Sequence, residues 1–112
     1  MPKSNAKTKV NVKKTAAKDL QRHAGDAAAL LKALANEQRL SILCSLLEGP
    51  MSVGQINKCV DLSQSALSQH LAVLREGGWV ETEKEAQTVY YSVPKGPVHK
   101  VLETLKDIYC PR

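Results

Sequence analysis

The sequence predicts a mainly α-helical domain that carries one β-hairpin, and three observations support this fold class. From Asp19 onward, apolar residues recur at steps of three and four positions in most segments, which is the period of an amphipathic helix. Capping residues and Gly-Pro or Gly-Gly pairs divide these segments into short helices. Residues 79–93 instead collect strand-forming side chains. With 112 residues, 43% of them hydrophobic and 24% charged, the chain suits one soluble domain.

The positive charge of the chain is concentrated near its beginning. Residues 1–22 hold seven Lys or Arg and one acidic residue, for a net charge of +6, whereas residues 23–112 hold nine against ten, for a net charge of −1. A segment rich in Lys, Thr, Asn and Ala buries little apolar area, so we expect residues 1–17 to form a disordered basic tail and residues 18–110 to form the domain. The tail is either a solubilising extension or an auxiliary phosphate contact.

Two helices are expected first. One spans about Ala16–Ala35, and its apolar stripe consists of Leu20, Ala24, Ala27, Leu31 and Leu34. Asn36 is a suitable N-cap for the second, which Gly49-Pro50 ends. One stripe of this second helix contains Leu40, Leu43, Cys44 and Leu47, and we expect the helix to be mostly buried.

A helix-turn-helix is expected next. Ser52 can cap a short helix whose inward side is Val53, Ile56 and Val60, and within it we interpret Cys59 as a packing residue. After the brief connection Asp61-Leu62, Ser63 can cap a further helix with Leu67, Leu71 and Leu74 on one side and Gly77-Gly78 at its end. Two short helices joined by a tight turn form a helix-turn-helix.

A hairpin and a final helix complete the predicted domain. Strands are expected at Trp79–Glu83 and Thr88–Val93, with a charged tip at 84–87. Helical spacing resumes at Val98 and continues to the C-terminus. The order α-α-α-α-β-β-α, with the hairpin as the wing, is that of a winged helix-turn-helix.

The helix that begins after Ser63 has an unusual outward face. Its polar positions are Gln64, Ser65, Ser68 and Gln69, and none of them is charged. Gln can pair bidentately with adenine, Ser can bond base edges or phosphates, and short side chains allow close approach to a groove. An ordinary solvated face is the alternative, but such faces usually carry Glu, Lys and Arg. The pattern therefore favours DNA reading.

Several other classes of protein are disfavoured. No stretch approaches the length of an apolar membrane span, and the basic start lacks the apolar core of a secretory signal, so we expect a cytoplasmic protein. Three cysteines do not form a disulfide framework, and their default state is the thiol. His23, His70 and His99 have no recognisable catalytic setting, so we expect neither an enzyme nor a cofactor. A winged helix that binds only proteins remains an alternative.

Four stretches stand out within residues 24–110: LKALANEQRLSILC at 31–44, LSQSALSQHL at 62–71, EAQTVYYSV at 85–93 and DIYC at 107–110. Together they resemble the ArsR/SmtB repressor family, and in particular its thiol-sensing branch. The resemblance implies a homodimer, built through the first and last helices, that binds an inverted repeat of double-stranded DNA in a promoter. Recognition helices about one DNA turn apart, roughly 34 Å, can enter successive major grooves.

The same resemblance implies roles for single residues. It assigns to the groove the four polar residues Gln64, Ser65, Ser68 and Gln69, and it places His70 near the DNA backbone. Lys84 and Gln87 at the wing tip would contact phosphate or the minor groove, and Arg39 is another phosphate candidate. A surface ion pair of Arg39 with Glu37 or Asp26 and a structural hydrogen bond for His70 are the alternatives.

The ligand positions of the family's metal-sensing branches are not kept. Ser52 stands where one pattern has cysteine, and the last-helix pattern is replaced by Lys95, Pro97, Ile108 and Pro111. His99 and Glu103 make only a weak pair, whereas zinc needs three or four converging donors. We therefore expect no metal site, although a metalloid inducer that uses the thiols remains an alternative.

Cys44 and Cys110 occupy the positions of the reactive pair in the thiol-sensing branch, so the resemblance implies a dithiol switch driven by oxidants or reactive sulfur species. Two thiols can be joined as a disulfide or through additional sulfur atoms. Joining them would pull the last helix against the second helix and weaken DNA binding. The alternative is that Cys44 is a small packing residue of its apolar stripe.

Overall fold

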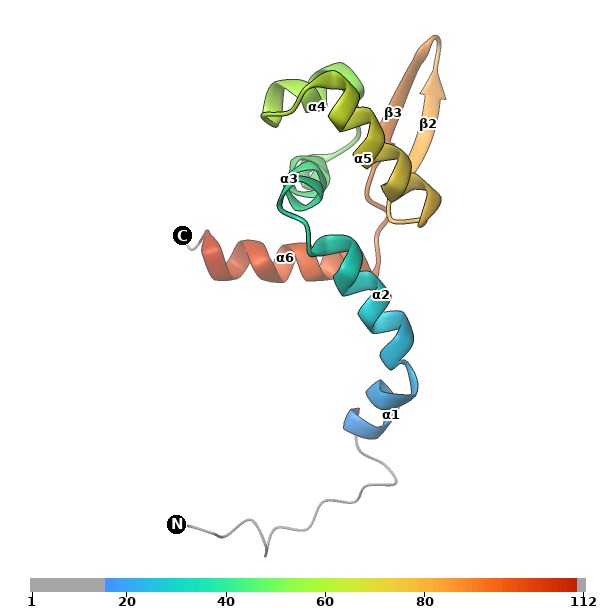
Figure 1. The fold of residues 1–112 in the computed structure, drawn as a ribbon, viewed down its shortest axis with the longest axis vertical. Coiled ribbons are helices and arrows are strands. Elements are labelled where there is room, and N and C mark those ends of the chain that lie inside the picture. The colour runs from blue at the N-terminus through green and yellow to red at the C-terminus, as the bar shows by residue number, and fades with distance from the viewer. Residues whose placement is uncertain (1–15, 111–112) are drawn as a thin grey trace, which may run out of the picture. The chain divides into compact units, whose positions relative to one another are not determined.

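The computed structural model describes residues 16–110. Its elements, in chain order, are α1 Ala16–Arg22, α2 Ala24–Leu34, α3 Glu37–Ser45, the 3₁₀ turn η2 Leu46–Glu48, β1 Met51–Ser52, α4 Val53–Cys59, α5 Gln64–Glu76, β2 Glu81–Glu85, β3 Thr88–Ser92 and α6 Pro97–Tyr109 (Figure 1). The chain divides into a first part that ends at Leu31 and a second part that begins at Lys32. The predicted tail 1–17 lies almost wholly outside the described residues.

The first part differs from the single helix predicted for 16–35. The chain turns at His23, whose backbone N–H bonds to the carbonyl of Leu20 three residues back, and this turn separates α1 from α2. The predicted apolar stripe is not a buried face either, because Leu20 is 62% exposed and Leu31 is 58% exposed. Of that stripe, only Leu34 is buried.

The core of the second part is built around α3, whose start was predicted correctly. Asn36 caps it by accepting from the backbone N–H groups of Gln38 and Arg39 at 3.0 and 2.9 Å. One side of α3 and of η2 is fully buried. The aliphatic side chains that make up the centre of this core are Ile42, Leu43, Leu46, Ile56, Leu67, Leu71, Leu74 and Leu102.

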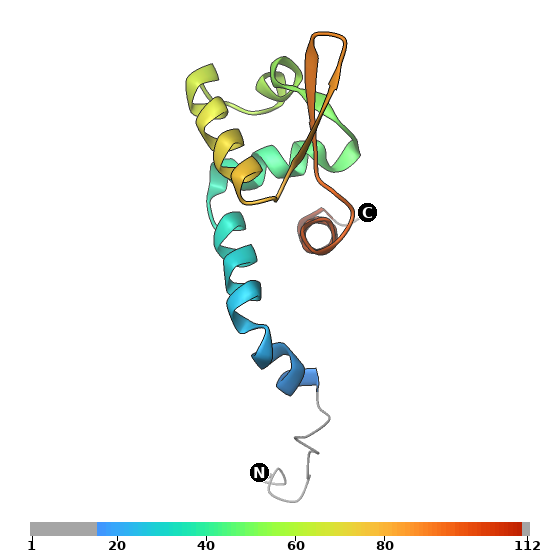
Figure 2. The ribbon, with the colours of Figure 1, turned by 90° about the vertical axis from the view of Figure 1, so that its right-hand side faces the viewer.

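The helix-turn-helix is confirmed. Ser52 and Gln55 form a capping box at the start of α4, with each side chain bonded to the other's backbone N–H at 3.2 and 2.9 Å. The turn that follows is held by Asn57, whose amide donates to the carbonyl of Leu62 at 2.8 Å. Ser63 then caps α5 by accepting from the N–H of Ala66. Figures 1 and 2 show α3, α4 and α5 grouped beside the hairpin.

The wing is an antiparallel sheet of three strands in the order β1-β3-β2. Its third strand, β1, was not predicted; it pairs Met51 with Tyr91 and Ser52 with Tyr90. The hairpin strands are also shifted relative to the prediction, because β2 continues to Glu85 and leaves only Ala86 and Gln87 in the turn. Ala86 takes a positive φ of 57°, which tight hairpin turns require.

Helix α6 was predicted correctly, and Pro97 stands in its first turn, where a missing N–H costs nothing. Val98 and Leu102 are buried, and α6 crosses beneath α3 in both ribbon views (Figures 1 and 2). Its other end remains apolar and uncovered, with Ile108 at 60% and Tyr109 at 77% exposure. Within residues 16–110, no helix has the length and apolar character needed to cross a lipid bilayer.

Candidate functional site

The outward face of α5 has the composition that the sequence indicated. Three buried leucines, Leu67, Leu71 and Leu74, fix one side of this helix in the core. The opposite side is therefore directed to solvent, and its four polar residues Gln64, Ser65, Ser68 and Gln69 are all exposed. Since a helix held rigidly by its apolar side can enter a major groove with its polar side, this geometry suits DNA reading.

His70 is also on α5 but is held differently. Its Nε2 lies 3.0 Å from Oε1 of Gln38, which is on α3. Because an amide oxygen can only accept, this hydrogen bond requires the imidazole to donate through Nε2. The bond joins two helices that are far apart in the sequence, as the structural alternative for His70 predicted. The backbone contact predicted for His70 remains a prediction.

Arg39 makes neither of the predicted ion pairs. Its Nε donates to the carbonyl of Ala33 at 2.9 Å, and its Nη2 donates to the carbonyl of Lys32 at 3.2 Å. These carbonyls belong to the last turn of α2, where the carbonyl of Lys32 also accepts from the N–H of Ala35, so the half-buried Arg39 caps that helix end. A phosphate contact by Arg39 stays a prediction, and the guanidinium would have to keep this capping role while making it.

The wing has two chemically different faces. Directly opposed residues in an antiparallel pair share a face, so Lys84 shares one with Val89, and Glu83 shares the other with Tyr90. Since successive residues alternate, the glutamates at 81, 83 and 85 project together on the side away from Lys84. Lys84 thus lies within the strand rather than at the tip, which corrects the prediction. Gln87 is exposed in the turn, as predicted.

A cleft separates α5 from the wing. It has a volume of about 460 Å³ and is lined by Ser68, Ala72, Arg75 and Glu76 of α5 together with Tyr91 of β3. Since Tyr91 pairs with Thr82, two residues from Lys84, the Lys84 face of the wing is the one directed to α5. Arg75 and Tyr91 were not among the predicted site residues. Arg75 could have been found from the sequence, because it lies in the last turn of the same helix that carries the polar face.

The two thiols implicated by the sequence line the same cavity. Cys44 is in the last turn of α3, and Cys110 is the C-cap of α6, where its N–H bonds to the carbonyl of Lys106. Both are free, exposed thiols, and both line one cavity between these helices. Cys44 is therefore a surface residue of α3 that lines an apolar cavity, and its role in a switch stays a prediction.

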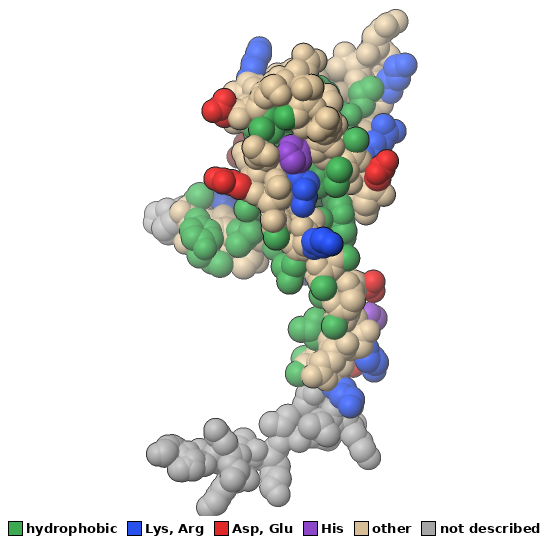
Figure 3. Space-filling model, viewed as in Figure 1, with side chains coloured by type: hydrophobic (Ala, Val, Ile, Leu, Met, Phe, Trp, Pro, Cys, Tyr) green, Lys and Arg blue, Asp and Glu red, His purple; other side chains and the backbone are tan. Residues whose placement is uncertain are grey.

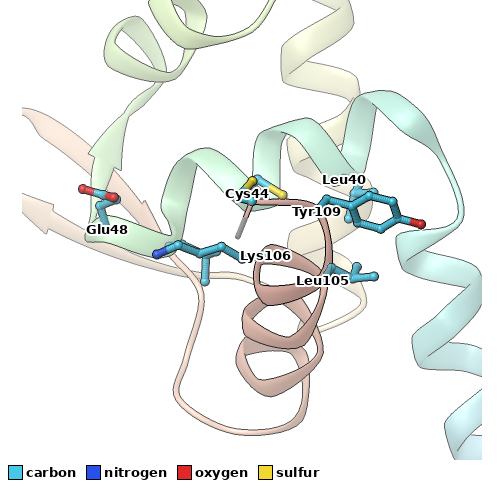
Figure 4. Close-up of a pocket in the computed structure, with 8 residues that line it drawn as sticks. Leu40, Cys44, Glu48, Leu105, Lys106 and Tyr109 are labelled. Atoms are coloured by element: carbon cyan, nitrogen blue, oxygen red, sulfur yellow. The ribbon is translucent and has the colours of Figure 1, made fainter. Parts of the chain in front are cut away.

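The cavity around the thiols is apolar and has a volume of about 360 Å³. Its walls also include the side chains of Leu40, Leu47, Leu105 and Tyr109, with Glu48 and Lys106 at its margin (Figure 4). Partial burial against these walls raises the pKa of the Cys44 thiol, and the nearby charge of Cys110 raises that pKa further. The two sulfurs are thus close enough to influence each other electrostatically.

Cys59 lies apart from this pair. It is exposed at the end of α4 and lines a different cavity, together with Met51 and Gln55. The interpretation of Cys59 as a packing residue is wrong, because its side of the short helix α4 remains open to solvent. Among residues 16–110, no three His, Cys, Asp or Glu side chains come together in a way that could hold a metal ion.

Comparison with known proteins places this site in a family. Residues 36–82 match the model of the bacterial regulatory protein, arsR family. The transcriptional activator HlyU of Vibrio cholerae is 50% identical over 92 residues, which cover 82% of this chain and 85% of HlyU. The chain belongs to the ArsR family. ArsR-family proteins are DNA-binding transcriptional regulators, so the chain is not an enzyme.

Solved structures of ArsR-family proteins have the same fold. Reduced HlyU from Vibrio cholerae is 49% identical with a TM-score of 0.76 over 83% of this chain and 98% of HlyU. The repressor BigR from Xylella fastidiosa is 34% identical with a TM-score of 0.80 over 88% of this chain and all of BigR. The homodimeric winged helix-turn-helix domain Mb0332 of Mycobacterium bovis is 30% identical with a TM-score of 0.68, over 80% of this chain and 84% of the Mb0332 domain. The predicted fold class is thus confirmed.

Proposed function

We propose that this chain is a homodimeric repressor that binds an inverted repeat of promoter DNA when Cys44 and Cys110 are reduced, and releases it when they are joined. The observation that carries the proposal is that these two exposed thiols line one cavity between α3 and α6. Cys59 lies outside that cavity and takes no part. The effector is an oxidant or a reactive sulfur species.

The uncharged face of α5 supplies sequence reading. Gln64, Ser65, Ser68 and Gln69 contact base edges in the major groove, where each bidentate pair discriminates by about 1–3 kcal/mol. Arg75 in the cleft beside α5 and Lys84 on the same face of the wing as Tyr91 contact the flanking phosphates, with Gln87 at the wing tip. Arg39 and His70 are further candidates for backbone contact. Phosphate contacts position the protein, and base contacts give selectivity.

Uncovered apolar side chains support a dimer. Hydrophobic side chains gather over the C-terminal half of α6 (Figure 3), and Ile108 there is exposed and does not line the thiol cavity. Leu20 of α1 and Leu31 of α2 are equally uncovered. Pairing of two copies through these helices removes such surface from water, at about 25 cal/mol per Å² of apolar area. The homodimeric Mb0332 domain has the same fold.

Helix α3 transmits the state of the thiols to the DNA-binding face. Cys44 is near its C-terminal end, whereas Gln38, near its N-terminal end, holds His70 of α5. Joining Cys44 to Cys110 fixes the end of α6 against α3, which changes the angle between the two protomers and the spacing of their recognition helices. Moving the balance from mostly bound to mostly released takes about 3–5.5 kcal/mol of differential affinity, within the range of a covalent crosslink.

The proposal is tested with DNA selected by the reduced protein from a random duplex pool. We expect the selected sequence to be an inverted repeat bound by two copies of the chain, with affinity falling steeply as salt rises. Oxidation should weaken binding in parallel with a Cys44–Cys110 linkage detected by mass spectrometry, and a reductant should restore it. A protein that selects no sequence, or binds equally in both states, contradicts the proposal.

A further inference from the structure

The cavity that contains Cys44 and Cys110 is larger than two thiols need. Its volume of about 360 Å³ falls within the roughly 300–1,000 Å³ typical of small-molecule sites. It is also more than twice the size of an engineered apolar cavity, about 150 Å³, that holds benzene. A small organic group therefore fits beside the thiols.

The walls of the cavity select against charge. Leu40 and Leu47 come from the α3 side, and Leu105 and Tyr109 come from α6. In Figure 4, Leu105 and Tyr109 extend toward Leu40, whereas Lys106 extends toward the side where Glu48 lies. Because these two margin residues have opposite charges, their charges offset each other, and a charged ligand placed among the leucines would lose hydration without compensation.

We infer that this cavity binds the apolar group of a small organic hydroperoxide and presents its O–O bond to Cys44 and Cys110. The inference rests on the thiol switch proposed above and names its effector class. Hydrogen peroxide has no apolar group to place against the leucines, so it reacts without help from the cavity. Apolar walls beside the reacting sulfurs thus favour one oxidant over another when both react with thiols by the same chemistry.

The reaction is balanced by the two thiols and one hydroperoxide. A thiolate sulfur attacks the distal oxygen, the O–O bond breaks, and the organic fragment leaves as an alcohol after taking a proton. The resulting sulfenic acid is attacked by the second thiolate, an S–S bond forms, and water leaves. The two cysteines lose two electrons, and the hydroperoxide gains them. The raised pKa of Cys44 keeps more of that thiol protonated at neutral pH than in a free cysteine.

The test compares cumene hydroperoxide with hydrogen peroxide on the full reduced chain. Formation of the Cys44–Cys110 disulfide is followed by mass spectrometry, and each rate is divided by that of N-acetylcysteine with the same oxidant. We expect this normalised rate to be higher for cumene hydroperoxide by about tenfold or more, the effect of burying a small apolar group. Leu40→Gln and Leu47→Gln should bring the ratio toward one. Val73→Gln, at an exposed apolar position outside the cavity, should leave it unchanged.

A second measurement keeps the inference testable if those variants do not fold. Cumyl alcohol, the reaction product, should slow oxidation of the unmodified protein by cumene hydroperoxide and leave oxidation by hydrogen peroxide unaffected. If the normalised ratio is one and cumyl alcohol does not slow oxidation by cumene hydroperoxide, the inference is overturned. DNA release by either oxidant would still leave the thiol switch standing. If neither oxidant forms the disulfide, the inference fails, while DNA release caused by a reactive sulfur species would leave the thiol switch standing.

Discussion

Burial raises the pKa of Cys44 on α3, and the charge of Cys110, which ends α6, raises that pKa further. Burial against the apolar cavity is the larger cause of the shift, and the charge of Cys110 is the second. Both causes favour the neutral thiol of Cys44, so this residue is less ionised at neutral pH than a free cysteine. The two side chains are therefore coupled before any covalent bond joins them.

This coupling predicts how Cys44 titrates. Its alkylation rate should rise with pH at a higher midpoint than that of a free cysteine. In Cys110→Ser, the midpoint should move down, because the like charge is gone, but should stay above the free value, because burial remains. Mass spectrometry of the Cys44 peptide after timed iodoacetamide treatment measures this, with Cys59→Ser as the control. An identical midpoint in Cys110→Ser and the parent would show that the thiols do not interact.

Truncating the polar side chains of α5 should reduce selectivity for the selected repeat without reducing the charge-driven part of DNA binding. Gln64→Ala and Ser68→Ala should each reduce the preference for the selected repeat over random DNA, by about 1–3 kcal/mol where a bidentate base contact is lost. The slope of affinity against salt should not change, since no phosphate contact is removed. Thr104→Ala, at an exposed position of α6, is the control. Unchanged selectivity in both α5 variants would remove the basis for DNA reading by this face.

The His70–Gln38 bond predicts an interaction that appears in a double-mutant cycle. Gln38→Ala and His70→Ala should each weaken DNA binding by the reduced protein, by about 0.5–1.5 kcal/mol, because the recognition helix loses a fixed contact with α3. Because both variants remove the same bond, the double variant should lose little more than either single variant. Fluorescence anisotropy on the selected duplex measures this. Strictly additive losses would mean that the bond does not position α5.

Gly77 and Gly54 predict opposite effects on stability. A Cβ at Gly77 would fall inside the contact distance of the Trp79 indole, so Gly77→Ala should displace that ring and cost about 1–3 kcal/mol of unfolding free energy. Gly54 is on α4 with open space around it, so Gly54→Ala should stabilise the helix by up to about 1 kcal/mol. Urea unfolding followed by the fluorescence of the single Trp measures both. Equal stability of the two variants would contradict this packing.

Local signals in the sequence were sufficient for most of the fold. Asn36, Ser52 and Ser63 each cap a helix as predicted, because capping depends on hydrogen bonds within three residues. Strand β1 was missed because its two residues become a strand only by pairing with Tyr90 and Tyr91, almost forty positions away. Spacing alone also could not show that Leu20 and Leu31 stay uncovered on a single chain.

The part of the candidate site that depends on local sequence signals was also predictable. The period of α5 fixes which side its leucines bury, so the exposure of Gln64 and Ser68 follows from the sequence. The cavity shared by Cys44 and Cys110 depends on how α6 crosses α3, which no local pattern encodes. The break at His23 and the two-residue hairpin turn, which places Lys84 within a strand, likewise depend on backbone hydrogen bonds rather than on periodicity.

The dependence of DNA release on Cys44 and Cys110 together is the most direct test of this account. The affinity for the selected duplex is measured for reduced and oxidised forms of the parent, Cys44→Ser, Cys110→Ser and Cys59→Ser. A fall in affinity of about a hundredfold or more on oxidation is expected for the parent and for Cys59→Ser, and none for the other two. Release that persists in Cys44→Ser or Cys110→Ser, or that disappears in Cys59→Ser, would contradict it.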